Sequence, residues 1–388
     1  MKKEPKIKIK GFEGEWKKYS FNNLFSLVSD YKSNIGNKTD YQEEGKYPII
    51  DQSKEYIVGY TNEDNPIIPD NGIIVFGDHT REIKYIDFPF YTGADGTKLL
   101  HCQQSVFPLF GYYSCCSQRI PNTGYNRHYK FLKEADYIIP SLTEQRAIAT
   151  YFRHIDSLIE TADKKVASLK QVKEASLQSM FPKEGQKVPE VRFKGFEGEW
   201  KATLLKEISQ KVVEKNVKLQ YKITLTNSAE YGIIDQLDFF DHRISNNDNI
   251  RNYYIVRDRD FVYNPRISTS APVGPINQNL LGYVGVVSPL YYVFRIHNID
   301  ECYLRYFFKT KLWHTFMKDN GNSGARFDRL SITDDIFEKM PIIHPADTAE
   351  QRKIASFFVH IDKQIAIAQQ RLDLLRRIKS ACLDEMFV

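Results

Sequence analysis

Two long stretches of the chain carry apolar residues at alternating steps of four and three, separated by polar positions. These positions are Ile148, Phe152, Ile155, Ile159, Ala162, Val166 and Leu169 in the first stretch, and Ile354, Phe358, Ile361, Ile365, Ala368, Leu372 and Leu375 in the second. A mean step of about 3.5 residues is the pattern of a coiled-coil seam. We therefore expect two paired helices of about 40 residues each, over residues 141–181 and 346–388.

Both predicted helices begin at the same kind of signal. Ser141 and Asp347 stand three residues before Glu144 and Glu350, which is the spacing of a capping box, so we expect the glutamates to cap their helices. The segment between the helices can connect them most simply if the end of the first helix lies beside the start of the second. The pair is therefore predicted to be antiparallel, with the N-terminal leader near the end of the second helix.

The chain repeats itself. Residues 144–181 align without a gap with residues 350–387, and 17 of these 38 positions are identical when the two segments are compared. A leader with the sequence Gly-Phe-Glu-Gly-Glu-Trp-Lys also occurs twice, at residues 11–17 and 195–201, whereas Lys18–Ile139 and Ala202–Ile343 share little. The repeat indicates two equal frames that carry two different inserts.

Both inserts show short apolar runs between turn residues. Strands are predicted over residues 47–51, 72–77 and 84–91 in the first insert, and over 222–226, 260–263, 284–287 and 291–295 in the second, with a helix over 302–318. This mixture predicts an α+β fold for each insert. The expected division of the chain is a leader with the first insert over residues 1–140, a helix over 141–181, a second leader and insert over 182–345, and a helix over 346–388.

Composition narrows the classes of function. The 388 residues contain no apolar run that approaches the roughly 18 residues of a membrane span, so we expect a cytoplasmic protein without a membrane partner. The five cysteines show no C-x-x-C spacing, which favours a reducing compartment and no structural metal. The net charge of +5 is modest, so a polyanion would have to bind local basic patches.

Polar loops occur at matching places in the two inserts. Residues 77–84 and 264–270 follow the central predicted strand of each insert, and residues 119–130 and 320–329 lie near its end. Glycine lets backbone amides approach phosphates, while arginine and asparagine can reach base edges with two hydrogen bonds. A solvated surface loop has the same composition, but its occurrence at the same place in two dissimilar inserts favours nucleic-acid binding.

A catalytic centre is the weaker interpretation. Asp70, Glu82 and Lys84 fit the loose PD-(D/E)-x-K pattern of Mg²⁺-dependent nucleases, but the pattern often occurs by chance and the second insert has no equivalent. Paired-histidine metal motifs, phosphate-binding loops and dinucleotide fingerprints are missing from the sequence. We expect a binding protein without a cofactor of its own. A free-standing nuclease and a coiled-coil adaptor between proteins are the alternatives.

A His-Ile-Asp sequence occupies the same place on both helices, as His154 with Asp156 and as His360 with Asp362. Each copy could tie its helix to its own insert by a hydrogen bond. The two copies could instead form an external surface at which a partner binds twice. We favour the docking surface, because the same three residues occur on both helices.

Several of these segments resemble the specificity (S) subunit of type I restriction-modification systems. The resemblance rests on the leader 191–200, the junctions 140–146 and 345–352, and the order of insert, helix, insert and helix. Residues 77–81 with 93–98, and 264–266 with 287–291, are also similar to the target recognition domains of that family.

The resemblance implies that each insert is a target recognition domain that reads one half of a bipartite, asymmetric double-stranded DNA site, with the coiled coil between them. It implies docking of two methylation subunits that bind S-adenosylmethionine and modify adenine N6, and an optional pair of restriction subunits that use ATP and Mg²⁺ for type I site-specific deoxyribonuclease activity. This chain would itself be non-catalytic. The expected DNA contacts are Arg81, Lys84, Lys98, Arg119 and Arg127 in the first insert, and Arg266, Arg326 and Arg329 in the second.

Overall fold

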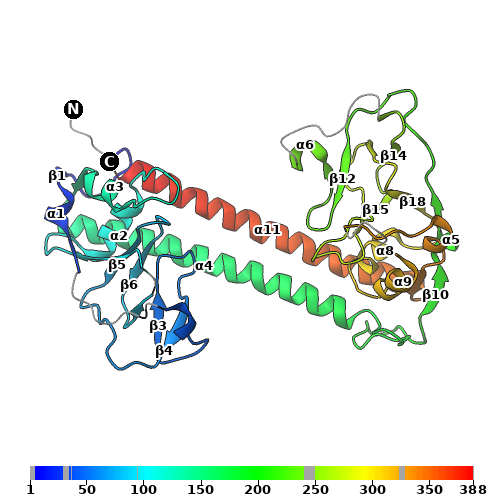
Figure 1. The fold of residues 1–388 in the computed structure, drawn as a ribbon, viewed down its shortest axis with the longest axis horizontal. Helices are drawn as coiled ribbons and strands as arrows, with labels where there is room; N and C mark the ends of the chain where they lie inside the picture. The colour runs from blue at the N-terminus through cyan, green and yellow to red at the C-terminus, as the bar shows by residue number, and fades with distance from the viewer. Residues whose placement is uncertain are drawn as a thin grey trace. The chain divides into compact units, whose positions relative to one another are not determined.

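The computed structural model describes residues 5–28, 35, 37–93, 95–239, 250–322 and 328–387. The chain forms two compact units, one of residues 1–165 with 368–388 and the other of residues 166–367. Each unit holds one insert together with one part of each long helix, α4 (Leu142–Ser179) and α11 (Thr348–Met386) (Figure 1).

The first unit is built on a four-stranded antiparallel sheet in the order β2-β8-β5-β6. The central strand β5 (Ile73–Gly77) is buried at every position. Side chains alternate across a strand, so Ile74 and Phe76 enter the core beneath α2, whereas Ile73 and Val75 pack into a second cluster on the other face. An unbroken apolar run therefore gives a strand that is covered on both faces.

A smaller sheet of three strands, β4-β3-β7, extends the first insert. The ladder β1–β9 closes the insert by pairing Lys17 with Ile139, so that both ends of the insert meet next to the start of α4. The elements before α4 are β1 (Lys17–Tyr19), α1 (Phe21–Leu24), β2 (Phe25–Leu27), η1 (Lys38–Asp40), β3 (Tyr47–Ile50), β4 (Gly59–Thr61), β5, β6 (Ile83–Ile86), β7 (Tyr91–Thr92), β8 (Thr97–Cys102), α2 (Pro108–Cys116), α3 (Tyr129–Glu134) and β9 (Tyr137–Ile139).

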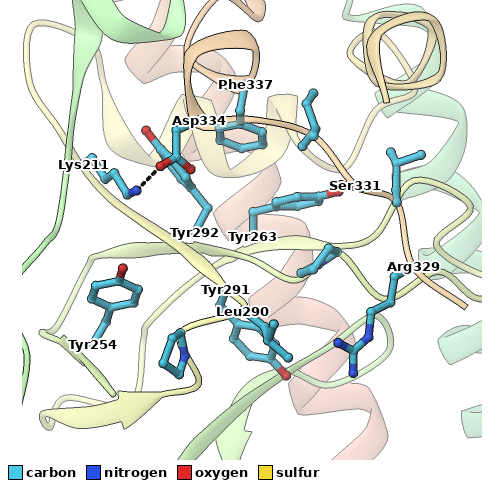
Figure 2. Close-up of a pocket in the computed structure, with 14 residues that line it drawn as sticks. Lys211, Tyr254, Tyr263, Leu290, Tyr291, Tyr292, Arg329, Ser331, Asp334 and Phe337 are labelled. Atoms are coloured by element: carbon cyan, nitrogen blue, oxygen red, sulfur yellow. Dashed lines mark hydrogen bonds and ion pairs between the residues drawn. The ribbon is translucent and has the colours of Figure 1, made fainter. Parts of the chain in front are cut away.

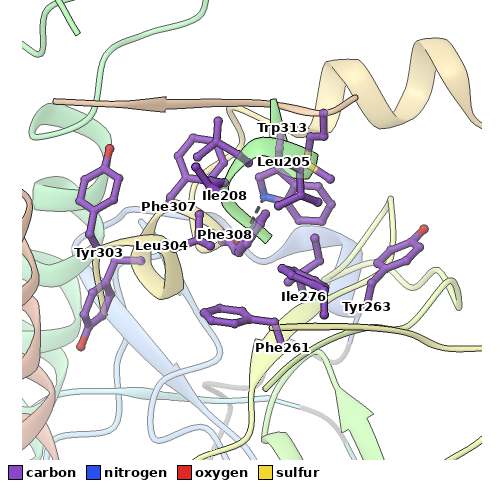
Figure 3. Packing of buried hydrophobic residues seen from close by; sticks show 14 of the residues in the cluster. Leu205, Ile208, Phe261, Tyr263, Ile276, Tyr303, Leu304, Phe307, Phe308 and Trp313 are labelled. Carbon is purple, nitrogen blue, oxygen red and sulfur yellow. Dashed lines mark hydrogen bonds between the residues drawn. The ribbon is translucent and has the colours of Figure 1, made fainter. Parts of the chain in front are cut away.

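The second unit repeats this plan with different strands. Its four-stranded antiparallel sheet has the order β11-β18-β15-β16, and β10–β19 closes the insert in the way that β1–β9 closes the first. A hairpin β12–β13 and a pair β14–β17 take the place of the three-stranded sheet. The core beside the sheet contains the aromatic side chains of Phe261, Phe307, Phe308 and Trp313 (Figure 3). Two dissimilar sequences thus build equivalent central sheets.

The elements of the second unit before α11 have these bounds: β10 (Lys201–Leu204), α5 (Leu205–Ile208), β11 (Ser209–Lys211), β12 (Leu225–Ser228), β13 (Gly232–Asp235), α6 (Gln236–Phe239), β14 (Tyr254–Val256), β15 (Phe261–Tyr263), β16 (Ile276–Gln278), β17 (Gly285–Val287), β18 (Tyr292–Ile296), α8 (Glu301–Phe307), α9 (His314–Asn320), α10 (Asp334–Phe337) and β19 (Pro341–His344). The α+β prediction is confirmed.

Three predicted elements are wrong in extent. The strand predicted over residues 222–226 is displaced to β12 (Leu225–Ser228). The helix over residues 302–318 is broken into α8 and α9, because the intervening turn folds back and the indole of Trp313 donates a hydrogen bond to the Phe308 carbonyl (3.3 Å). The strand over residues 84–91 ends at β6 and resumes as β7, with Pro89 between them. Proline has no N–H for a strand ladder, which accounts for an interruption there.

The two long helices run antiparallel within each unit. In the first unit Tyr151 contacts Cys382, Asp156 pairs with Lys379 and Asp163 pairs with Arg376, so one helix ascends as the other descends. In the second unit the end of α4 lies beside the start of α11, where Lys173 pairs with Asp362. The backbone amides of Lys6 and Ile7 bond to the Glu385 carbonyl (2.9 and 3.1 Å), which confirms that the N-terminal leader lies at the end of α11.

Every position of the predicted apolar stripe is buried or half-buried. Its partners differ along its length, however. Ile148, Phe152 and Ile155 belong to the core of the first insert, and Ile354 and Phe358 belong to the core of the second. The start of each stripe therefore anchors an insert, in addition to facing the other helix.

Candidate nucleic-acid interface

The same three side chains join insert and helices in both units. In the first, the Tyr113 hydroxyl of α2 donates to Asp156 (2.7 Å), and the Lys379 ammonium lies 2.6 Å from the other oxygen of that carboxylate. In the second, Tyr306 of α8 donates to Asp362 (2.7 Å) and Lys173 lies 2.6 Å from it. We call each set a helix joint. Burial, followed by the neighbouring carboxylate, raises the pKa of both tyrosines, which therefore remain hydrogen-bond donors.

A second tie is also repeated. Gln145 accepts a hydrogen bond from the Phe107 amide (2.8 Å) and donates one to the Pro140 carbonyl (3.0 Å). Gln351 accepts from the Asp300 amide (3.0 Å) and donates to the Pro345 carbonyl (2.9 Å). Phe107 and Asp300 directly precede α2 and α8. The glutamines thus fix the start of the helix that supplies the tyrosine of each joint.

The two aspartates of the His-Ile-Asp sequences are held inside their own units. Asp156 and Asp362 take the first of the two roles considered for them, the tie between helix and insert. His154 and His360, by contrast, are exposed. Docking of a partner remains a prediction for these two histidines.

The glutamates at the helix starts bind the leaders, and the expectation that they act as caps is wrong. Glu144 accepts a hydrogen bond from the Trp16 indole (3.2 Å), and Glu350 receives two from the Arg192 guanidinium (2.7 and 2.8 Å). A capping box would need each carboxylate to turn back to its own helix start. Ser141 does cap, since its hydroxyl accepts from the Glu144 amide (3.4 Å).

The two polar loops of the first insert come together, although about 40 residues separate them. Asp78, which directly follows β5, is buried, and its carboxylate accepts from the Tyr129 amide (2.8 Å). Its carbonyl accepts from the His128 amide (2.8 Å), and the Arg81 guanidinium reaches the Ile120 carbonyl (3.5 Å). Residues 77–84 and 119–130 therefore form one surface, the first paired loops.

The second insert joins its loops at the equivalent place. Asn264, which directly follows β15, is buried, and its side chain accepts from the Arg266 amide (3.0 Å). The Leu330 amide bonds to the Pro265 carbonyl (2.9 Å), and the Ile267 amide bonds to the Asp328 carbonyl (3.0 Å). Residues 264–270 and the described part of 320–329 form the second paired loops. A buried polar residue at the end of the central strand organises both surfaces.

Most of the first insert's candidate cations are accessible. Arg119 and Arg127 are exposed on the first paired loops, and Arg81 and Lys98 are half-buried beside them. Arg119 approaches Asp384 at 3.7 Å, but both side chains are at least half exposed, so this pair contributes little stability.

Lys84 is not available as a DNA contact, and that prediction is wrong. Its side chain is buried, and its ammonium donates to the carbonyls of Asp51 (2.8 Å) and Glu55. Burial lowers the pKa of Lys84 against the opposing effect of nearby carboxylates. The lysine therefore fastens a loop from within the domain.

The same geometry contradicts the nuclease alternative. Asp70 precedes the start of β5, whereas Glu82 precedes β6, and β6 runs antiparallel to β5 with Ile83 opposite Phe76. The two carboxylates thus lie at opposite ends of a ladder about 13 Å long. Two carboxylates on one metal ion would have to approach within a few ångströms of each other. Among the residues that the structure describes, no three His, Cys, Asp or Glu side chains are grouped so that they could hold a metal ion.

In the second insert Arg266 is exposed and Arg329 is half-buried on the second paired loops. Both guanidinium groups approach the Asp328 carboxylate, at 3.7 and 3.8 Å. The backbones of Arg266 and Arg329 form an isolated bridge, which holds the two side chains at one place. Arg326 lies outside the described residues.

Sequence reasoning missed a cleft of about 530 Å³ in the second insert, with Arg329 in its lining (Figure 2). Its walls carry the rings of Tyr254, Tyr263, Tyr291 and Tyr292, and the ion pair between Lys211 and Asp334 closes one side (Figure 2). Aromatic rings next to a cation are suited to stacking with bases. The abundance of tyrosine in this insert was the available signal, but the lining comes from strands and loops far apart in the sequence.

No helix in the described part of the chain is long and apolar enough to cross a membrane.

Comparisons with known proteins agree on one family. Residues 13–171 and 197–377 each match the model of the type I restriction modification DNA specificity domain. Among solved structures, the S subunit of a type I restriction-modification system from M. genitalium is similar over 100% of this chain and 99% of its own, with 16% identity and a TM-score of 0.62. A chain from a study of complex assembly and conformational transition of the type I R-M system is similar over 97% and 98%, with 13% identity and a TM-score of 0.51. No curated protein matches the chain.

Proposed function

The chain belongs to the type I restriction-modification DNA specificity family, and on this basis we propose that it is the sequence-reading subunit of such a complex. Each insert acts as a target recognition domain for one half of a bipartite double-stranded DNA site, and the coiled coil sets the spacing between the halves. One observation carries the proposal: a repeated frame presents two dissimilar sets of paired loops at equivalent places.

The chemistry of the paired loops supports DNA as the ligand. Exposed arginines such as Arg127 and Arg266 can bind phosphates as well as base edges, and the buried Asp78 and Asn264 fix the loops that carry them. Phosphate contacts orient a protein on DNA, whereas base contacts supply the specificity. Because the two loop sets have different sequences, the proposed site is asymmetric although the frame is repeated.

In this proposal the partner subunits catalyse the reactions, and this chain is not itself an enzyme. Two methylation subunits bind S-adenosylmethionine and dock on the helices, where His154 and His360 present the same exposed residue twice. A pair of restriction subunits using ATP and Mg²⁺ completes the complex where the cell contains them. The family match and the repeat of the helices support two docking sites in place of one.

The proposal is tested by mapping methylated adenines across the genome of cells that contain this chain and its methylation partner. We expect one motif with two unlike halves separated by a fixed number of unread base pairs. Cells with the methylation partner alone are the control and should show no such motif. Methylation at a continuous motif, or the same pattern in the control, would contradict the proposal.

A further inference from the structure

The first paired loops present an exposed aromatic side chain that is held in place. Tyr125 lies near the tip of the loop 119–130 and is 86% exposed. Its ring nevertheless stacks on the His79 imidazole from the other loop, with centroids 4.6 Å apart and planes 7° from parallel. A loop tyrosine without such a neighbour would sample several rotamers, and ordering it on binding would cost conformational entropy.

The base of this stack is itself fixed. The His79 amide donates to the Gln52 side chain (3.1 Å), and the Gln52 amide group donates to the Asp95 carbonyl (2.7 Å). Gly96 packs so closely that a Cβ there would lie 2.8 Å from His79 Cδ2. His79 therefore has little freedom to move.

The turn that carries Tyr125 is anchored separately. His128 is fully buried, and its ring accepts a hydrogen bond from the Thr123 amide (3.3 Å). The Gly124 amide donates to the Asn122 side chain (3.2 Å), and Gly124 takes a positive φ of 78° that suits glycine. Two anchors, one beneath the turn and one beneath the ring, hold a single exposed side chain.

From this geometry, and resting on the proposed function, we infer that Tyr125 contacts bases of the half-site read by the first insert and sets the preference at one position. Tyrosine carries no charge, so its ring does not add to the counterion release that dominates sequence-independent affinity. The exposed Arg119 and Arg127 of the same loop can supply the phosphate contacts. A rigid ring in the same loop as these two cations can then meet base edges or a thymine methyl group.

The test replaces Tyr125 by alanine in the complete complex with its methylation subunits and compares the methylated motif with that of the wild type. We expect discrimination at one position of one half-site to fall about 10-fold to 100-fold, while the other half-site and the spacing stay the same. Tyr231→Ala, at an exposed tyrosine of the second insert, is the matched control and should leave the first half-site unchanged.

His79 is inferred to be a positioning residue, and its variants separate orientation from folding. His79→Ala should relax the same position as Tyr125→Ala, and His79→Phe, which restores a stacking ring, should recover discrimination. Thermal unfolding shows whether each variant folds. The inference fails if Tyr125→Ala leaves the motif intact, or if it weakens binding to all sequences equally, as loss of a phosphate contact would. If the wild type itself shows no bipartite motif, the proposed function fails instead.

Discussion

The two helix joints and the two sets of paired loops follow opposite rules. The joints use the same residues at distances that agree within 0.1 Å, with 2.7 Å from tyrosine to aspartate and 2.6 Å from lysine to aspartate in each unit. The paired loops share only their position and one buried polar residue, Asp78 in the first and Asn264 in the second. The frame thus keeps its chemistry while the surfaces that it presents are free to differ.

The comparison also shows where a repeated frame can vary. Glu144 and Glu350 are equivalent and both are buried, yet one is bound by the Trp16 indole and the other by the Arg192 guanidinium. Trp200, the counterpart of Trp16, is buried with no partner for its indole nitrogen. The equivalent glutamates therefore keep their burial but not their partners.

The largest expected effects are equal in the two units. Phe152 and Phe358 are fully buried and pack against the tilted rings of Tyr113 and Tyr306, at 4.9 and 5.0 Å between centroids. Phe152→Ala and Phe358→Ala should each lower the free energy of unfolding by about 3–5 kcal/mol, since each leaves a cavity in an insert core. Urea denaturation measures this, with Val172→Ala at a half-exposed helix position as the control. A twofold difference between the losses of unfolding free energy in the two variants would contradict the equivalence of the joints.

The two units should differ at the glutamates that begin the long helices. Glu350→Gln removes the charge from a buried pair and leaves the Arg192 guanidinium without its counter-ion, which should cost about 2–3 kcal/mol in unfolding free energy. Glu144→Gln keeps an acceptor for the neutral Trp16 indole and should cost less than about 1 kcal/mol. Equal losses would show that the two leaders are held alike.

The contribution of Glu144 to stability depends on pH. Burial raises the pKa of Glu144 above its ordinary 4.5, against the smaller opposing effects of Trp16 and Lys8. The folded state then binds the proton more tightly than the unfolded state. The stability from this group is present below pH 4.5 and is lost as the pH rises through the folded pKa. The wild type should lose unfolding free energy as the pH rises through the folded pKa of Glu144, and Glu144→Gln should abolish this loss.

Smaller and again equal effects are expected from the joint aspartates. Asp156→Asn and Asp362→Asn keep an acceptor for the tyrosine but lose the ion pair with lysine. Both side chains of each ion pair are partly exposed. Each should lower the unfolding free energy by about 0.5–1.5 kcal/mol. His154→Ala, at an exposed position two residues from Asp156, is the matched control and should change stability by less than about 0.5 kcal/mol.

The smallest effect is confined to the second unit and to acid pH. Burial, followed by Lys318 and Lys311, lowers the pKa of His314 from 6.5 to about 4. Between these values the unfolded state binds a proton that the folded state does not, so stability is lost as the pH falls below 6.5. Denaturation midpoints of the wild type and His314→Gln should converge as the pH falls. An unchanged acid sensitivity in the variant would exclude His314 as its source.

The frame was predictable because its signals are periodic or repeated. The 3.5-residue stripe, the paired leaders and the bridging requirement together indicate two antiparallel helices, and the described contacts confirm them. The joints could also have been found, because Lys173 and Lys379 are identical at equivalent places in the repeat. Their tyrosine partners could not, since Tyr113 and Tyr306 lie in inserts with no alignment between them.

The interface was predictable in part. The position of the paired loops followed from the central strands β5 and β15, whose apolar runs are plain in the sequence. The prediction for Lys84 rested on its charge alone, although Lys84 and Ile86 lie two residues apart and therefore share the buried face of β6. The cleft around Tyr291 and the stack of Tyr125 on His79 depend on contacts between distant segments, which composition and local pattern do not reveal.

If each insert reads its half of the site independently on a shared frame, one half can be exchanged alone. The measurement exchanges residues 18–139 for the first insert of another family member and maps adenine methylation with the same methylation partner. We expect one half of the motif to change completely, while the other half and the spacing remain as in the wild type. A change in both halves, or in neither, would contradict it.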